Sequence, residues 1–343
     1  MNCAVVILNW NGKHHLERFL PSVVSHTKSK IIVADNCSTD DSISLLKENY
    51  PQISIIQNQK NYGFALGYNE ALKQIEGKFD YYILLNSDVE VTENWDTHLV
   101  NLLENNKDIA ACQSKILSVT EKEFFEYGGA SGGFIDKLGY TFCRGRIFTE
   151  QEKDEKQYDK AQEIFWASGA CFAVRANLFH QFNGFDADYY AHMEEIDLCW
   201  RLKLYGHKIY VEPKSVVYHL GGGSLQYESP FKTYLNFRNN LLLLVKNDTS
   251  GWLFFKIIFR LKLDGLAGLR YLLQGKFMLL LSIIHAHFDF YKRLSKFLKK
   301  RKENLKNTYS KNLVGFYNKS IIWQFFVKGK RKFSELNQEA FNR

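Results

Sequence analysis

The stretch YILLNSDVEV, residues 82–91, decides the fold class of this chain. It opens with four largely apolar residues in a row, a pattern typical of a strand that is buried on both faces of a sheet. The run ends in Asn86-Ser87-Asp88, and a short alternation of apolar residues follows at Val89 and Val91. A buried strand that delivers a carboxylate at its end predicts either a turn or a ligand site at Asp88.

Three earlier stretches repeat this strand pattern, and helical patterns separate them. The strands are predicted at AVVILNW (4–10), IIVADN (31–36) and ISIIQN (53–58), and the first helix at HHLERFLPSVVSH (14–26). Strands that alternate with helices of this length require right-handed crossovers. The sequence therefore predicts an α/β fold with a doubly wound, mostly parallel central sheet.

Polar clusters follow each of these strands. They are Asn9-Trp10-Asn11-Gly12, Asp35-Asn36-Cys37-Ser38, Asn61-Tyr62-Gly63 and Asn86-Ser87-Asp88. Any one cluster alone reads as a turn, because Asn, Asp, Ser and Gly dominate turns. In a doubly wound sheet, however, ligands bind where the carboxyl ends of the strands meet. Their shared position therefore predicts one ligand site.

The composition excludes several classes of protein. With 343 residues, 45% of them hydrophobic and 24% charged, the chain is neither disordered nor collagen-like. Its first residues lack the basic flank of a signal peptide, and the apolar run FMLLLSIIHAHF is too short to span a membrane. Six cysteines without a CxxC pair are expected to be reduced core residues of a cytoplasmic protein.

The C-terminal part differs in character. The net charge of +8 is concentrated in residues 256–343, where apolar stretches such as WLFFKIIFRLKL carry Lys and Arg. Such helices are predicted to lie in a membrane interface, with a hairpin packed on the preceding domain as the alternative. Nucleic acid is disfavoured as a partner because the cations sit on strongly apolar helices. We divide the chain into a domain at 1–245 and a basic, amphipathic helical region at 246–343.

The chain resembles the family 2 glycosyltransferases with a GT-A fold, and most closely their rhamnosyltransferase-like subset. The resemblance covers residues 1–245 and is carried, in this order, by VVILNWNG, ADNCSTD, NYGFALGYN, LLNSDVEV, WASGACF, MEEIDLCWR and YHLGGGS. It implies an inverting transfer of a sugar from a UDP- or dTDP-sugar, dTDP-rhamnose among them. The implied acceptor is a glycan or a polyprenyl-linked glycan in cell-surface polysaccharide synthesis, at the inner face of the cell membrane.

The resemblance also implies roles for the strand-end residues. Asp88 and His219 match the positions that hold a divalent metal, Mn²⁺ or Mg²⁺, which neutralises the departing diphosphate. Ser87 stands where many members have a second Asp that contacts the ribose.

On the nucleobase side, Asn9 and Asp35 match the nucleotide-contacting positions, and a carboxylate there can accept the N3–H of uracil or thymine. Asn61, Gly63 and Asn69 border the nucleotide.

The remaining implied roles fall after residue 160. In HMEEIDLCWR, Glu195 matches the base that deprotonates the acceptor. Asp197 and Arg201, which follow Glu194 at successive helix turns, belong to the same catalytic motif and are expected to support the base. The alternative is that these acids merely favour a helix N-terminus. Trp166 and the Ser168-Gly169 turn fit a wall on the acceptor side, unless Trp166 is a core residue.

Three rival functions stay open at this point. A sugar nucleotidyltransferase would use a similar sheet, but WNGKHHLERF lacks the Gly- and Arg-rich loop that grips a triphosphate. A non-catalytic nucleotide- or glycan-binding protein would not need Glu195. In a docking protein, the basic C-terminal region would carry the function and the N-terminal domain would serve as a docking platform.

Overall fold

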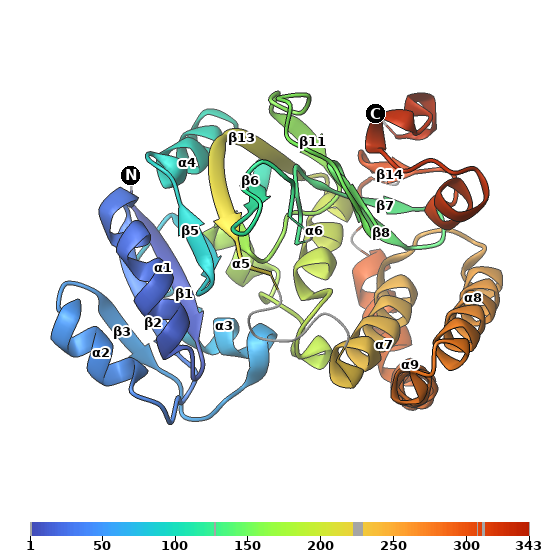
Figure 1. Ribbon diagram of the computed structural model, residues 1–343, viewed down its shortest axis with the longest axis horizontal. Coiled ribbons are helices and arrows are strands. Elements are labelled where there is room, and N and C mark those ends of the chain that lie inside the picture. The colour runs from blue at the N-terminus through green and yellow to red at the C-terminus, as the bar shows by residue number, and fades with distance from the viewer. Residues whose placement is uncertain (1, 127, 222–228, 307, 311–312, 343) are drawn as a thin grey trace.

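The computed structural model describes residues 2–126, 128–221, 229–306, 308–310 and 313–342 (Figure 1). Within these residues, nine strands form one mixed sheet in the order β11-β13-β6-β12-β4-β1-β2-β3, with β5 paired to β13. A second sheet of five strands has the order β10-β9-β8-β7-β14. Figure 1 shows β1, β2 and β3 at one end of the molecule and helices α7, α8 and α9 at the other.

The strands are β1 Cys3–Asn9, β2 Lys30–Asp35, β3 Ser54–Gln57, β4 Tyr81–Asn86, β5 Val89–Val91, β6 Ile109–Ser118, β7 Gly133–Asp136, β8 Thr141–Cys143, β9 Arg146–Ile147, β10 Glu150–Gln151, β11 Gln162–Ile164, β12 Cys171–Arg175, β13 Lys208–His219 and β14 Phe316–Tyr317. The α-helices are α1 Lys13–His26, α2 Ser42–Asn49, α3 Gly63–Lys73, α4 Trp95–Asn105, α5 Ala176–Gln181, α6 Glu194–Leu204, α7 Pro230–Asn247, α8 Leu253–Leu273 and α9 Phe277–Lys306.

The predicted α/β fold is confirmed, and strand β4 shows why its sequence is continuously apolar. Tyr82 and Leu84 point into the core on one face of the sheet, and Tyr81, Ile83 and Leu85 into the core on the other. Both faces of this strand are covered, so every position along it is apolar.

The parallel part of the sheet brings the polar strand ends together, as predicted. β3, β2, β1 and β4 pair in parallel, and the register places Asn9 opposite Asp35 and Leu8 opposite Asn86. β12 then pairs antiparallel with both β4 and β6, which makes the whole sheet mixed.

A bend in β13 carries its end toward β5. The register with β6 shifts between Glu212 and Val216, where Pro213 cannot donate to the ladder. Such an irregularity re-aims the strand beyond it. The last residues of β13 pair with β5, and His219 lies opposite Val89.

The C-terminal part is less separate than the predicted division at residue 245 implies. That boundary falls within the last turn of α7, and α7 packs along α9. The chain then returns to the catalytic part, where β14 pairs with β7 of the second sheet. Residues 246–343 are therefore not wholly helical.

Two further sequence expectations meet the structure here. All six cysteines are free, and five are buried, but Cys37 is exposed. Among the described residues, no helix combines the length and the apolar character needed to cross a bilayer.

Candidate active site

Asp88 and His219 lie together, as predicted. His219 Nε2 is 3.2 Å from Asp88 Oδ1, and its Nδ1 is 3.0 Å from Glu126 Oε2. All three side chains are buried. The β5–β13 pairing places Asp88 beside His219, while Glu126 enters from the loop after β6. The imidazole is therefore held between two carboxylates.

This arrangement favours the charged imidazole. Burial alone would lower the pKa of His219, but Asp88 and Glu126 outweigh it and raise that pKa to about 10. Burial likewise works against ionisation of Asp88, but the neighbouring His219 holds the pKa of this carboxyl below its usual value. The chain thus carries an imidazolium between two carboxylates when nothing else binds there.

We expect the chain, kept in chelator, to lose stability as the pH rises from 6.5 to 8.5. His219 has a pKa of about 10 in the folded chain and an ordinary value of 6.5. Its contribution is complete below pH 6.5 and declines until pH 10, with a slope of at most about 1.4 kcal/mol per pH unit. Urea unfolding across this window measures it. In His219→Gln the slope should vanish, and an unchanged slope would contradict the assignment.

A divalent cation fits this place only with help from a substrate. Across the described ranges, no three His, Cys, Asp or Glu side chains form a group that could hold a metal ion. Asp88 and His219 offer one carboxylate oxygen and one imidazole nitrogen. Mg²⁺ and Mn²⁺ sites that use one or two protein ligands are commonly completed by phosphate oxygens and water. The pair therefore suits a cation that arrives with a diphosphate.

Asn9 and Asp35 form the nucleobase side of the predicted site. Asn9 Nδ2 donates to Asp35 Oδ1 at 3.0 Å, and the backbone N–H of Ser38 donates to Asp35 Oδ2 at 2.9 Å. Asp35 is only 1% exposed. Both of its oxygens are engaged, so it shapes the loop that follows β2. Ser87 lies nearby, because a Cβ on Gly12 would meet Asn9 Oδ1 at 2.5 Å and Ser87 Oγ at 3.9 Å.

Asn61 and Gly63 converge on Asn36, a residue that the sequence analysis did not single out. Asn36 Nδ2 donates to Asn61 Oδ1 at 2.9 Å and to the carbonyl of Gly63 at 3.0 Å. Gly63 has a φ of +74°, and a Cβ there would lie 2.5 Å from the ring of Tyr190. The next two N–H groups of α3, those of Phe64 and Ala65, donate to the carbonyl of Tyr190 at 3.0 Å, and the N–H of Gly63 donates to Asn61 Oδ1.

Glu195 occupies the first turn of α6, next to Glu194. Burial raises the pKa of both carboxyls, and that of Glu194 lies further above its usual range because Glu195 is its neighbour. Backbone groups, Gly169 among them, work against the rise at Glu195. Glu194 is 3% exposed, whereas Glu195 is only partly buried. Of the two side chains, Glu195 is the more exposed, although its Oε2 is buried without a hydrogen-bond partner.

Asp197 lies in a different setting from Glu195. It is fully buried, and it accepts hydrogen bonds from Arg201 Nε, Lys246 Nζ and Asn247 Nδ2, each at 2.8 Å. Such a surrounded carboxylate cannot take a proton from a substrate. Asp197 is therefore a support of α6, in a different environment from that of Glu195.

The loop before α6 is strained. Tyr190, His192 and Met193 all have positive φ, at 68°, 66° and 75°. Non-glycine residues adopt this conformation only where the surroundings hold them. Asn239 of α7 holds this loop. Its Nδ2 donates to the carbonyls of Tyr189, Ala191 and His192 at 3.0, 2.8 and 2.8 Å.

We expect Asn239→Ala to destabilise the chain by about 2–4 kcal/mol, because it removes the side-chain donor to the carbonyls of Ala191 and His192, while Tyr189 keeps its bond from Arg238. Urea unfolding measures the change. Asn106→Ala removes an exposed side-chain bond to Leu102 and should cost less than about 0.5 kcal/mol. Equal effects of the two substitutions would contradict the proposed role of Asn239 in holding the loop before α6.

The Asp88–His219 pair and the Glu195 carboxylate on α6 lie in one neighbourhood of the structure. Glu126 Oε2 accepts a bond from the N–H of Gly128, and Ser168 Oγ donates to the carbonyl of Gly128. A Cβ on Gly169, the next residue, would lie 3.8 Å from Glu195 Oε1. Glu126 and Gly128 thus connect His219 to the Ser168-Gly169 turn and to Glu195.

Two sequence expectations for this region are decided by packing. Trp166 is a core residue, because its Nε1 donates to the carbonyl of Phe134 at 2.9 Å and its ring fills the space beside Gly133. Asn69 bonds to the backbone of Phe185 at 2.7 and 3.0 Å and so supports the loop before η1, Ala187–Tyr189. Of the predicted GGGS after His219, residues 222–224 lie outside the described part of the chain.

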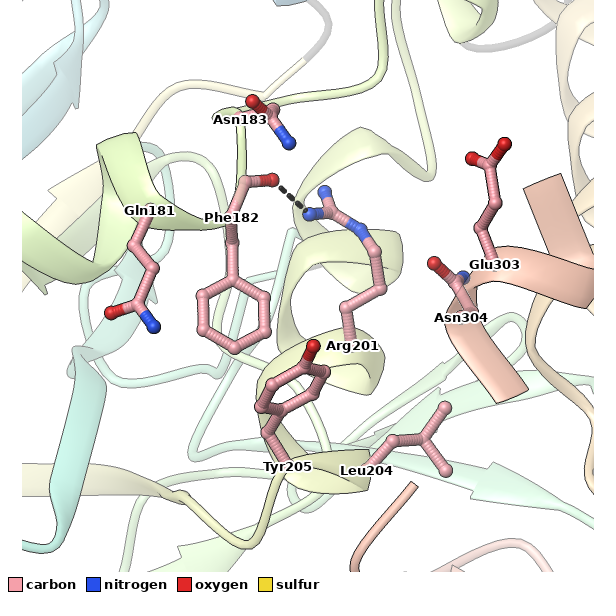
Figure 2. A pocket seen from close by; sticks show the side chains of 8 residues that line it. All are labelled: Gln181, Phe182, Asn183, Arg201, Leu204, Tyr205, Glu303 and Asn304. Atoms are coloured by element: carbon pink, nitrogen blue, oxygen red, sulfur yellow. Dashed lines mark hydrogen bonds between the residues drawn. The ribbon is translucent and has the colours of Figure 1, made fainter. Parts of the chain in front are cut away.

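A separate pocket of about 200 Å³ lies between α6 and the end of α9 (Figure 2). Figure 2 shows Arg201 at its wall, bonded to the carbonyl of Phe182 at 2.6 Å. The same guanidinium also donates to Gly184 and Asp197. The residues that line this pocket do not belong to the strand-end site. The cationic side chain among them, Arg201, already donates hydrogen bonds to Phe182, Gly184 and Asp197.

Several residues of the site escaped sequence analysis. Glu126 and Asn239 lie outside the predicted polar clusters, whereas Asn36 belongs to the cluster after the second strand but was given no role of its own. His15, in the first turn of α1, also helps to lower the pKa of Asp88 through its charge. The paired histidines after the first strand were the signal that could have indicated it.

Comparison with known proteins agrees with this arrangement. The model of the family "Glycosyl transferase family 2" matches residues 4–182, just over half of the chain. An N-acetylglucosaminyl-diphospho-decaprenol L-rhamnosyltransferase of Mycobacterium tuberculosis is 27% identical over 239 residues, which cover 63% of this chain and 75% of that protein. Rhamnosyltransferase WbbL of Escherichia coli is 25% identical over 217 residues, covering 61% and 80%.

A solved structure shares the fold. GalNAc-T7 with UDP, GalNAc and Mn²⁺ superposes with a TM-score of 0.56 at 18% identity, over 72% of this chain and about half (48%) of that one. The rival functions are not favoured by any of these matches. The chain therefore belongs to glycosyl transferase family 2, and it is a rhamnosyltransferase-like glycosyltransferase with the GT-A fold.

Proposed function

We propose that this glycosyltransferase moves a sugar from a UDP- or dTDP-sugar, with dTDP-rhamnose as the leading donor, to a polyprenyl-linked glycan. The transfer inverts the anomeric centre and belongs to cell-surface polysaccharide synthesis. The observation that carries the proposal is the convergence of the Asp88–His219 pair and Glu195 around Glu126 and Gly128 at the carboxyl edge of the sheet. One group there can hold a leaving diphosphate and the other can activate an acceptor.

Asp88 and His219 would hold the divalent cation, Mn²⁺ or Mg²⁺. When bound, such a cation neutralises the charge that develops on the departing diphosphate. Glu126 bonds to Nδ1 of His219, so it orients Nε2 toward Asp88 and keeps the ring in one position. GalNAc-T7, which shares the fold, was solved with UDP and Mn²⁺, and this supports the same class of ligand.

The nucleotide side is formed by Asn9, Asp35, Asn61, Gly63 and Ser87. Asp35 and Asn9 hold the loop after β2 in place. A direct bond from Asp35 to the N3–H of uracil or thymine would replace one of its two present donors. Ser87 presents a hydroxyl where a ribose contact is expected.

Glu195 would take the proton from the acceptor hydroxyl as that oxygen attacks the anomeric carbon. A base whose pKa is raised toward the working pH is well matched to this task. Burial raises the pKa of Glu195, and its partial exposure leaves it open to an acceptor. Asp197, Arg201 and Lys246 fix the helix that carries it.

The acceptor is proposed to be lipid-linked, in line with the name of the mycobacterial relative. The chain would then work at the inner face of the membrane, through the hairpin of α8 and the first half of α9. Many large apolar side chains are exposed there: Trp252, Phe254, Phe255, Ile258, Phe259, Leu266, Leu269, Leu272, Leu273, Phe277, Met278, Ile284 and Phe288.

The second half of α9 behaves differently. Lys296 and Lys300 bond to Asp188 and Asp186 of the loop before α6, at 2.5–2.7 Å. The sequence left two alternatives open, helices in a membrane interface and a hairpin packed on the catalytic domain. Each alternative finds support in a different part of the hairpin. The apolar part faces outward, and the basic part packs on the catalytic domain.

Calorimetric titration with UDP, dTDP, GDP and ADP, each with Mn²⁺ and with chelator, tests the proposal. We expect binding of one pyrimidine diphosphate, and only with the metal. Binding of none, or binding indifferent to the metal, would overturn the donor assignment.

A further inference from the structure

The segment 319–332 presents a second apolar and basic surface, apart from the α8–α9 hairpin. Trp323, Phe326 and Val327 are 54%, 53% and 55% exposed. The cations of the segment are Lys319, Lys328, Lys330, Arg331 and Lys332, and no acidic residue falls among them. Aromatic side chains beside cations are typical of a protein surface that enters a lipid headgroup layer.

This segment is anchored firmly, so its outward side chains are not displaced core residues. Ile321 and Phe325 are buried, and the ring of Phe325 packs on that of Phe148 at 5.0 Å. The backbone N–H groups of Arg331 and Lys332 donate to the carboxylate of Glu335 at 2.7 and 3.2 Å. The fold thus holds Trp323, Phe326 and Val327 in solvent.

The same turn supports this segment and α8. The N–H of Ile321 donates to Asp136 Oδ2 at 2.8 Å. Arg260 of α8 donates to the carbonyl of Leu138 at 2.9 Å and lies 3.6 Å over the ring of Tyr140. Figure 1 shows the C-terminal segment, in red, at the same end of the molecule as α8. The two exposed surfaces are therefore neighbours.

A lipid surface fits this combination better than a second copy of the chain. In a symmetric dimer the same patch faces itself, so the lysines and arginine of one copy would meet those of the other. An anionic headgroup layer supplies the opposite charge instead, and its acyl region accepts the aromatic rings. Charge complementarity thus selects an anionic membrane.

We propose that residues 319–332 form a second membrane-binding element, which acts with the α8–α9 hairpin as one docking surface. Contact at two elements fixes the orientation of the protein relative to the bilayer. Contact through the hairpin alone would allow the protein to change its tilt. The proposal extends the membrane partner of the proposed function, but it stands on the exposure and charge of its own residues.

Quenching of tryptophan fluorescence by vesicles with brominated acyl chains tests this surface directly. The vesicles contain phosphatidylcholine and phosphatidylglycerol at about 4:1, without nucleotide or acceptor. Three of the six tryptophans are well exposed, namely Trp10, Trp252 and Trp323. We expect Trp252→Phe and Trp323→Phe each to reduce the quenched fraction, and Trp10→Phe to raise it slightly, because that substitution removes a fluorophore that stays unquenched. An undiminished quenched fraction in Trp323→Phe would overturn the proposal.

The basic residues are tested by sedimentation with the same vesicles, unbrominated. Lys319→Gln with Lys328→Gln is expected to weaken binding about thirtyfold, since each cation near an anionic surface contributes about fivefold. Lys47→Gln with Lys73→Gln, on exposed positions of α2 and α3, is the matched control and should change nothing. Equal losses in the two double variants would overturn the proposal.

Two other occupants are outcomes of the same work. Tight binding of a labelled nucleic-acid duplex that depends on Lys319 and Lys328, without vesicle binding, would overturn a lipid partner. So would a dimer in sedimentation equilibrium that Trp323→Phe dissociates. Failure of vesicle binding while the metal-dependent nucleotide titration succeeds would sink this inference and leave the assignment of donor and metal intact.

Discussion

Glu195→Gln is expected to lower the rate of sugar transfer by about 10²–10⁴-fold, the usual contribution of a general base. The amide keeps the size of the side chain but cannot take the acceptor proton. Because Glu195 is assigned to the acceptor side, binding of the donor diphosphate should be unchanged. Transfer to a synthetic lipid-linked acceptor measures the rate, and calorimetry measures nucleotide binding.

Two neighbouring variants make this prediction specific. Glu194→Gln replaces a carboxyl that is more deeply buried than that of Glu195, so it should slow transfer much less. Asp197→Asn disturbs the bonds to Arg201 and Lys246 and should lower stability more than it changes the pH profile. A larger loss of transfer in Glu194→Gln would move the base by one position.

Asp88→Ala is expected to weaken metal-dependent nucleotide binding by more than about 100-fold. Loss of an outer partner of a metal ligand typically costs 10–100-fold in affinity, and Asp88 is assigned as the ligand itself. The titration with and without Mn²⁺ measures the loss. Asp88→Asn keeps the shape of the site and should show the same loss if the charge matters.

Asp41→Ala is the matched control for this prediction. Asp41 is an exposed acid whose side chain pairs with Lys13 at 3.0 Å, so the same change of residue should leave the titration unaltered. Retention of metal-dependent binding in Asp88→Ala would make Asp88 a turn residue that only positions His219.

The class of fold and the grouping of the polar strand ends could be predicted from the sequence. Strand β4 could be predicted because a strand covered on both faces is apolar at every position. The polar clusters after β1, β2 and β4 could be grouped, since parallel strands end at one edge of a sheet. The first turn of α6 could be placed because the spacing of its acids follows the helix period.

Tertiary structure alone decided which of these residues work together. Glu126 meets His219 across 93 positions of sequence, and Asn239 meets Tyr189 across 50, so no local pattern indicates either contact. Packing also made Trp166 a core residue and gave Asp197 to an ion cluster with Lys246 of α7. Local periodicity reports how each segment is buried, but the partner of a buried polar group is set by whichever distant segment packs against it.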